Sequence, residues 1–299
     1  REGTGHELRD ESRTFEPEPA GAASIGQAHR ATRFDGRKVA VKLQYPGILD
    51  TLDADIQNIW SMMQMGRVIA NSEQLKVRLD ELKAGLLIEA DYEQEAAFIE
   101  EFGAQAAERE GIIVPTVHKD LSSKTVLVMD FIEGEKLDDA GMKLPVEERN
   151  RLAERLAEAF VWMFHERHFL HADPHPGNFL LTPEGEIAIL DWGCVRTFEP
   201  KFSDGWLGLV LALANEEPEG LRSKFDEVGF HPLRGFSGLS DDQLYELSHL
   251  TAAPVLEEGD FAWGNWNPKP PVEAYIKKNL GVMGYVPPAE ATFYYRTAM

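Results

Sequence analysis

The sequence predicts an α+β fold with two lobes, a small sheet-rich lobe followed by a larger helical lobe. Strand-like segments with turn residues lie mainly before residue 133, whereas the chain after residue 199 is mainly helical in pattern. The 299 residues, 43% of them hydrophobic, suffice for one large domain or for two lobes with a core each. We therefore expect a loose lead-in over 1–18, a first lobe over 19–133 and a second lobe over 134–299.

The expected strands come in three groups. Residues 20–34 and 35–46 predict strand, turn and strand, because the Asp35-Gly36 pair favours a tight hairpin turn. The segment "IIVPTVHKDLSSKTVLVMDFIEG", residues 112–134, predicts two strands about a turn. The segment "FLLTPEGEIAILDWG", residues 179–193, predicts a second hairpin around its Pro-Glu-Gly turn.

The expected helices follow from period and from helix-forming residues. Residues 48–110 have a helical period, and 79–108 contain strong helix formers and no proline. Residues 145–169 predict an amphipathic helix with Pro145 at its start. The longest apolar run, "WLGLVLALA" at 206–214, is too short to span a bilayer and predicts a buried helix.

Charge and cysteine content exclude several classes of protein. The formal charge is −21, so the phosphates of nucleic acid would be repelled, although an anionic small molecule remains compatible with a local cation or metal. The only cysteine is Cys194, so no internal disulfide forms and a reducing, cytoplasmic location is expected. No signal peptide or membrane span is recognisable, which leaves peripheral contact with a membrane open. His165 and His168 lack further ligands at zinc-site spacing.

The stretch "HADPHPGN", residues 171–178, is a rigid polar loop between apolar segments. Asp173 and Asn178 stand five positions apart, and the hairpin that follows ends on Asp191 in "ILDWG". This order is the one that phosphoryl transfer uses in kinases. Asp173 is suited to orienting or deprotonating an acceptor hydroxyl. Asn178 and Asp191 are hard oxygen ligands for Mg²⁺. The plain alternative is a polar turn with a capping aspartate.

Three upstream features bear on this interpretation. "VAVK" places Lys42 at the end of an apolar strand, suited to nucleotide phosphates, although it also fits an exposed lysine at a strand edge. The helix beginning near Leu82 carries several carboxylates, of which Asp91 and Glu95 share a face; the alternative is a solvated acidic face. The small-residue stretch "GAASIGQ", residues 21–27, is suited to approaching phosphates with backbone N–H groups.

Taken together, "AGAASIGQAHRA", "GRKVAVKLQYPGI", "EADYEQEAAF", "HADPHPGN" and "ILDWG" resemble the UbiB/ADCK (AarF-type) family of atypical kinases. The resemblance covers about residues 19–199. It implies a two-lobed protein-kinase-like fold, an enzyme that uses ATP and Mg²⁺, and a role supporting the biosynthesis of ubiquinone or another isoprenoid lipid. The partners it implies are an adenine nucleotide and isoprenoid lipids or quinone-biosynthesis proteins.

The resemblance also implies roles for single residues. Asp173 would be the catalytic aspartate, and Lys42 would pair with Glu95 and the nucleotide phosphates. The loop over the nucleotide would consist of Ala22, Ala23, Ser24 and Ile25, and the metal ligands would be Asn178 and Asp191. The Glu-x-Asp regulatory pair would be Glu89 and Asp91. The hinge would place the backbone of Asp130 and Ile132 against adenine.

The chain departs from the family pattern at three places. Gly21 stands where the family has the first of three alanines, and Trp192 replaces the phenylalanine of Asp-Phe-Gly. The family's Lys-x-Gly-Gln helix has no match in residues 1–19. Because the chain also begins without methionine, we expect a fragment whose site is more open than that of a longer chain.

Two other functional classes fit parts of the pattern. A small-molecule phosphotransferase of the aminoglycoside or choline kinase type shares the His-x-Asp loop, but not the alanine-rich loop or the Glu-x-Asp pair. A catalytically inactive nucleotide-binding scaffold is disfavoured, because every residue that phosphoryl transfer requires is present. An ordinary protein kinase is disfavoured, because only a short stretch separates Asp191 from the helix expected near Lys201. His175, Cys194 and the aromatic loop at 263–271 are compatible with simple packing roles.

Overall fold

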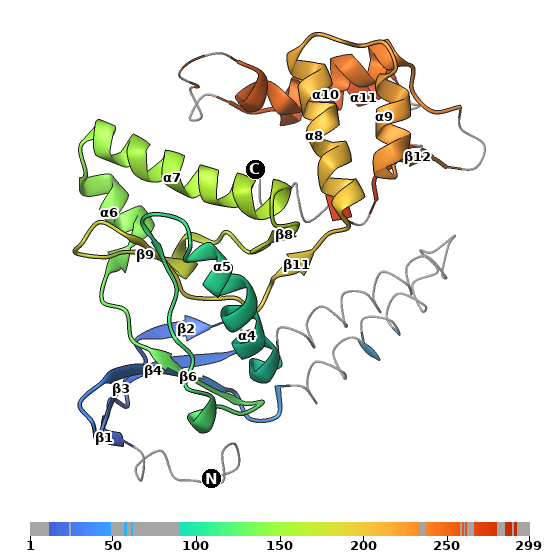
Figure 1. Cartoon of the computed structure of the whole chain (residues 1–299). Helices are drawn as coiled ribbons and strands as arrows, with labels where there is room; N and C mark the ends of the chain where they lie inside the picture. The colour runs from blue at the N-terminus through green and yellow to red at the C-terminus, as the bar shows by residue number, and fades with distance from the viewer. Residues whose placement is uncertain are drawn as a thin grey trace. The chain divides into compact units, whose positions relative to one another are not determined.

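A five-stranded antiparallel sheet forms the first part of the protein, seen in blue and green in the computed structural model (Figure 1). The structure describes residues 12–23, 25–48, 57–58, 61, 90–233, 237–257, 259, 261, 266–279, 285–288 and 290–291. The strand order is β1-β3-β4-β6, with β2 paired to β3. The bounds are β1 Ser12–Phe15, β2 Gly21–Ala23, β3 Gly26–Arg33, β4 Lys38–Gln44 and β6 Val126–Asp130.

The Asp35-Gly36 hairpin between β3 and β4 is confirmed, with Gly36 in the left-handed region at φ +87°. Two expectations about the preceding segment are wrong. Residues 20–34 do not form one strand, because the chain turns between β2 and β3 and the two pair antiparallel. The lead-in is not loose over Ser12–Phe15, because this segment pairs with β3 and Phe15 stacks on His29 at 5.0 Å between ring centroids.

Gly26 begins β3 at a point where no side chain fits. A Cβ there would lie 2.2 Å from the carbonyl oxygen of Leu43 and 2.7 Å from the hydroxyl of Tyr92. We expect Gly26→Ala to lower the free energy of unfolding by about 3 kcal/mol, because the backbone of β4 has to shift to admit the methyl group. Urea denaturation measures this. Gly21→Ala is the matched control, because nothing lies within 4 Å of its Cβ position. Equal stability of the two variants would contradict the account.

A second, four-stranded sheet runs β5-β10-β9-β7. The predicted hairpin of β9 and β10 is confirmed, with Gly185 of its turn at φ +82°. The two strands predicted over 112–134 are present but lie in different sheets: β5 pairs parallel with β10, whereas β6 belongs to the first sheet. Between them, Val117 forms an isolated antiparallel bridge with Met129. The bounds are β5 Ile112–Ile113, β7 Glu135–Lys136, β9 Phe179–Leu181 and β10 Ile187–Ile189.

The helix expected over 79–108 does not include Asp91, and the part of this segment before Ala90 lies outside the described residues. Asp91 has extended backbone angles and caps α4, its side chain accepting hydrogen bonds from the backbone N–H groups of Glu93 and Gln94. The expected amphipathic helix after Pro145 is confirmed as α7. The helical segments are α4 Tyr92–Phe98, the π-helical η1 Ile99–Gly103, α5 Ala104–Ala106, the 3₁₀ turns η2 Lys119–Leu121 and η3 Pro176–Asn178, α6 Leu137–Lys143 and α7 Val146–His165.

Helices dominate the later residues, as the sequence predicts. Their core is aromatic, with Phe164, Phe198, Phe202 and Trp206 in successive ring contacts. The bounds are β8 Phe169–Leu170, β11 Arg196–Thr197, α8 Pro200–Ala214, α9 Leu221–Val228, β12 His231–Pro232, α10 Asp241–Leu256, α11 Lys269–Lys278 and β13 Tyr285–Val286.

The apolar helix α8 is not buried all round. Leu207 is 40% and Leu211 52% exposed, although Trp206 and Leu209 are buried. The predicted helix is therefore present and buried on one side, because its apolar residues encircle the helix while only one side packs on the core. Among the described residues, no helix is both long and apolar enough to cross a membrane.

The α+β class is confirmed, and the chain forms two compact units. The first unit holds residues 1–159 and 173–195, and the second holds 160–172 and 196–299. The predicted lobe boundary after residue 133 lies inside the first unit, and these lobe limits stay a prediction. All of the catalytic and metal-binding residues expected from the sequence belong to the first unit.

Candidate functional site

A buried ion pair joins β4 to α4. Lys42 Nζ lies 2.5 Å from Glu95 Oε1 and 3.1 Å from Asp191 Oδ2. The side chains of Lys42 and Glu95 are 7% and 3% exposed, so Lys42 is no strand-edge lysine and Glu95 is not on a solvated face. The pair predicted across 53 positions is present. The Asp91 cap starts α4 so that Glu95 falls in its first turn, where the helix dipole favours a carboxylate.

The cluster holds two carboxylates against one ammonium group. Burial lowers the pKa of Lys42, but the charges of Asp191 and Glu95 outweigh this and hold that pKa above its ordinary value. Burial raises the pKa of Glu95 to about 7; the charge of Asp191 adds to this rise and Lys42 opposes it. Lys42 is therefore cationic at neutral pH, and Glu95 is the group that takes up a spare proton.

Trp192 supports the same carboxylate. Its backbone N–H donates to Glu95 Oε1 at 3.3 Å, and its indole N–H donates to the carbonyl of Ile189 at 3.1 Å. The side chain is completely buried. The sequence identified Trp192 only as a departure from the family pattern. Because Trp192 directly follows Asp191, its place in the sequence was enough to assign it to the site.

The polar loop brings Asp173 and Asn178 together. The Asn178 amide donates from Nδ2 to Asp173 Oδ2 at 3.0 Å and to the carbonyl oxygen of Asp173 at 3.2 Å. This orientation fixes the amide and leaves its Oδ1 as an oxygen ligand. Ala172, the residue before Asp173, has φ +43°, a left-handed conformation that costs about 1–2 kcal/mol for a residue with a Cβ.

The β9–β10 hairpin brings Asp191 to this loop. Phe179 faces Ile189 in the register, and the Leu190 N–H donates to the Asn178 carbonyl at 2.9 Å. Asp191 accepts from the Gly193 N–H through Oδ1 at 3.1 Å, while Oδ2 meets Lys42. The sharp bend after Asp191 thus supplies a backbone donor to its carboxylate.

The donor set suits a magnesium ion that also binds phosphate. Asn178 and Asp191 offer hard oxygen atoms, and Mg²⁺ commonly combines one or two protein oxygens with substrate phosphates and waters. In the part of the chain that the structure describes, no group of three or more His, Cys, Asp or Glu side chains is arranged to hold a metal ion.

The described residues of the alanine-rich loop lie mainly in β2 and at the start of β3, which pair antiparallel. Ala23 faces Gly26 in the register, and the Tyr45 N–H donates to the Ile25 carbonyl at 3.0 Å. Ala22 lies in β2 opposite Gln27. Ser24, expected over the nucleotide, lies outside the described residues, and so does Glu89 of the expected acidic pair.

Asp91, the second residue of the expected Glu89–Asp91 pair, caps the helix α4. Its carboxylate accepts from the Glu93 N–H at 3.0 Å and from the Gln94 N–H at 3.3 Å. The expectation that Asp91 shares a helix face with Glu95 is wrong, because the backbone at Asp91 is extended and lies before the helix. A regulatory role for Asp91 stays a prediction.

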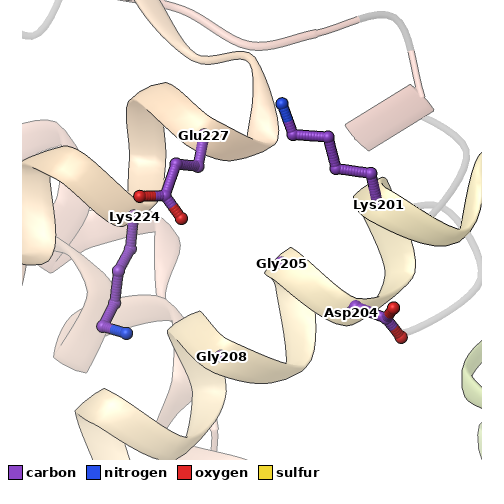
Figure 2. A pocket seen from close by; sticks show the side chains of 6 residues that line it. All are labelled: Lys201, Asp204, Gly205, Gly208, Lys224 and Glu227. Carbon is purple, nitrogen blue, oxygen red and sulfur yellow. The ribbon is translucent and has the colours of Figure 1, made fainter.

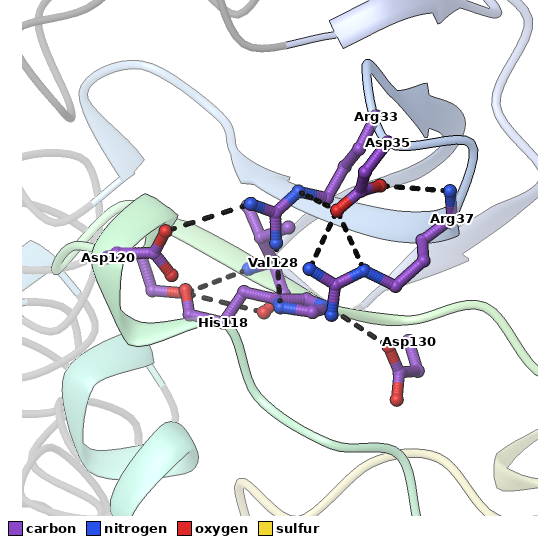
Figure 3. A network of polar contacts seen from close by, with 8 residues as sticks. Arg33, Asp35, Arg37, His118, Asp120, Val128 and Asp130 are labelled. Carbon is purple, nitrogen blue, oxygen red and sulfur yellow. Dashed lines mark hydrogen bonds and ion pairs between the residues drawn. The ribbon is translucent and has the colours of Figure 1, made fainter.

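The expected hinge lies at the end of β6. The Asp130 side chain accepts from His118 Nε2 at 2.9 Å, and Arg33 lies 3.1 Å from His118 Nδ1 (Figure 3). Because arginine only donates, Nδ1 accepts and the neutral imidazole carries its proton on Nε2. This side-chain network holds Asp130 from one flank, and it was not foreseen. The contact of Asp130 and Ile132 with adenine stays a prediction.

Other residues singled out in the sequence have ordinary roles. His175 caps the turn η3, its Nδ1 accepting from the Gly177 N–H at 3.0 Å. Cys194 is half-buried. A separate pocket of about 550 Å³ lies in the second unit, lined by α8 and α9 (Figure 2), and it contains none of the predicted site residues; its lining is Lys201, Asp204, Gly205, Gly208, Lys224 and Glu227.

Comparison with known proteins points to one family. A family model described as the ABC1 atypical kinase-like domain matches residues 1–224. The mitochondrial atypical kinase coq-8 of Caenorhabditis elegans is 30% identical over 264 residues, covering 85% of this chain and 33% of the relative. The mitochondrial atypical kinase COQ8 of Schizosaccharomyces pombe is 31% identical, covering 93% and 46%.

The chain spans less than half the length of these two curated relatives. A solved structure, the complex of Rv3197 with erythromycin from Mycobacterium tuberculosis, matches with a TM-score of 0.68 at 26% identity. That match covers 95% of this chain and 78% of the other. The fold resemblance therefore extends over nearly the whole chain.

Proposed function

Because this chain belongs to the ABC1 (UbiB/ADCK) family of atypical kinases, we propose that it is a phosphotransferase or ATPase that uses ATP and Mg²⁺ and supports isoprenoid-lipid biosynthesis of the ubiquinone type. The observation that carries the proposal is the buried Lys42–Glu95 pair joined to Asp191. Phosphoryl transfer in kinases uses an ammonium group held by carboxylates, together with an aspartate–asparagine loop that a hairpin joins to a metal-binding aspartate. This chain has the same arrangement of residues.

Each residue has a defined task in this mechanism. Lys42, held cationic, binds nucleotide phosphate oxygens, while Glu95 keeps its side chain oriented. Asp173 accepts the proton of an acceptor hydroxyl or water as the terminal P–O bond of ATP breaks and ADP leaves. Mg²⁺, when bound by Asn178 and Asp191, supplies neutralising charge to the phosphates.

The partners and location are part of the proposal. An adenine nucleotide is the first ligand, and isoprenoid lipids or quinone-biosynthesis proteins are the further partners, because the matched relatives are named COQ8 atypical kinases. The two relatives cited above are named mitochondrial. The single cysteine favours a reducing compartment for this chain, with peripheral rather than spanning contact to a membrane.

ATP turnover by the purified chain tests the proposal. ADP formation, free phosphate and phosphorylated acceptor are measured with and without Mg²⁺, and with isoprenoid quinone precursors, peptides, an aminoglycoside and erythromycin as acceptors. The proposal expects Mg²⁺-dependent turnover that quinone precursors stimulate. Transfer to an aminoglycoside or to erythromycin would favour the small-molecule phosphotransferase instead. Nucleotide binding with no turnover under any condition would favour the inactive scaffold.

A further inference from the structure

Tyr92 places a hydroxyl beside the candidate site where the described protein does not use it. The side chain is 2% exposed, and among the described residues its hydroxyl has no hydrogen-bond partner. Burying a hydroxyl without a partner costs about 1–3 kcal/mol, whereas a phenylalanine would fill the same space without that cost. The hydroxyl is therefore unexplained by packing.

The position of this hydroxyl is fixed by the backbone around it. The Tyr92 N–H donates to the Lys124 carbonyl at 3.1 Å, and the Gln44 amide donates to the Ala90 carbonyl at 2.7 Å. These bonds tie the start of α4 to the end of β4 and to the turn before β6. The phenol is thus held by a rigid frame.

The hydroxyl lies beside the start of β3 at Gly26. A Cβ on Gly26, the first residue of β3, would be 2.7 Å from the Tyr92 oxygen. Tyr92 stands three residues before Glu95 at the start of α4, so its backbone lies within one helical turn of the charged cluster. Burial is the main cause that raises the pKa of Tyr92 to about 12, so the hydroxyl stays protonated and is able to donate.

We propose that the Tyr92 hydroxyl donates a hydrogen bond to a phosphate oxygen of the nucleoside di- or triphosphate held at Lys42. This assignment rests on the proposed function. Because the Tyr92 side chain is screened from solvent, the assignment requires the backbone at Gly26 to move aside when the phosphate enters. A bond formed in this water-excluded place, to a charged acceptor, contributes more than one on the surface.

Tyr92→Phe tests the assignment, with nucleotide binding measured by isothermal titration calorimetry in the presence of Mg²⁺. We expect affinity for ATP and ADP to fall about tenfold, the effect of one hydrogen bond to a charged group, while adenosine binding is unchanged. Thermal stability of the free protein is expected to stay the same or rise. Tyr45→Phe, which removes a neighbouring but 41% exposed phenol, is the matched control and is expected to bind like the wild type.

Several outcomes overturn the assignment. Unchanged ATP affinity in Tyr92→Phe does so, and so does an equal loss for adenosine, which would mean an indirect effect on the shape of the site. A fall in the stability of the free variant would mean that the hydroxyl has a partner within the protein. If the wild-type chain binds no nucleotide, the proposed function fails and this assignment falls with it; if the wild type binds and the variant matches it, the assignment alone fails.

Discussion

Replacing Asp173 by asparagine is expected to reduce ATP turnover about 10²–10⁴-fold, the usual contribution of a positioned general base. Asparagine fills the same space but accepts no proton. Nucleotide affinity is expected to remain close to that of the wild type, because the proposed phosphate and metal contacts come from Lys42, Asn178 and Asp191. Stability is expected to change little, because the Asn178 amide is able to donate to the new side-chain oxygen as it does to Asp173 Oδ2.

Steady-state turnover and calorimetric binding of the same preparation separate these two effects. Glu184→Gln is the matched control for loss of one carboxylate, because Glu184 is an exposed residue in the turn between β9 and β10. Full turnover in Asp173→Asn would show that this aspartate is not the general base. A variant that lost nucleotide affinity and turnover in the same proportion would instead make Asp173 a binding residue.

Replacing Lys42 by methionine is expected to lower the free energy of unfolding by about 3–5 kcal/mol at pH 8, because Glu95 is left buried and uncompensated. Glu95→Gln in the same chain is expected to restore most of this loss, because no buried charge then lacks a partner. Nucleotide binding is not expected to return in the double variant. Urea denaturation gives the free energies of unfolding of the wild type, the two single variants and the double variant, which together form a double-mutant cycle.

The pH dependence of this loss has a definite sign. Without Lys42, burial holds the pKa of Glu95 higher still, so its charged form is penalised and stability falls as pH rises above the unfolded value of about 4.3. In the wild type, the pKa of Glu95 is raised to about 7, chiefly by burial, so at pH 5 both proteins carry it mostly protonated. The deficit of Lys42→Met is therefore expected to be small at pH 5 and large at pH 8. An equal deficit at both values would contradict the charge account.

The choice of Glu95 as the partner of Lys42 rested on the resemblance to the family. The sequence itself was sufficient to predict that Lys42 needs a buried anion, because a lysine at the end of an apolar strand is otherwise buried without a partner. It was also sufficient for the β9–β10 hairpin that joins Asn178 to Asp191, since the turn residues specify the register. Both inferences rest on local chemistry that a single chain displays.

Other features depend on contacts that no local pattern reveals. The start of α4 after Asp91 was missed, because the helix-forming residues on both sides of Asp91 outweighed the capping preference of this one aspartate. The separation of β5 from β6 was missed, because a sequence shows strands but not their partners in a sheet. Tyr92 and His118 were missed for the same reason: their significance comes from neighbours on other strands and helices.

Mg²⁺-dependent binding of ATP to the wild-type chain and to Asp191→Asn is the measurement that tests the central claim most directly. The account predicts that Mg²⁺ strengthens ATP binding to the wild type, and that the variant, while remaining folded by circular dichroism, loses this dependence because an amide is a weaker ligand than a carboxylate for a hard cation. The same Mg²⁺-dependent affinity in both proteins would contradict the assignment of Asp191 as the metal ligand, and with it the site proposed here.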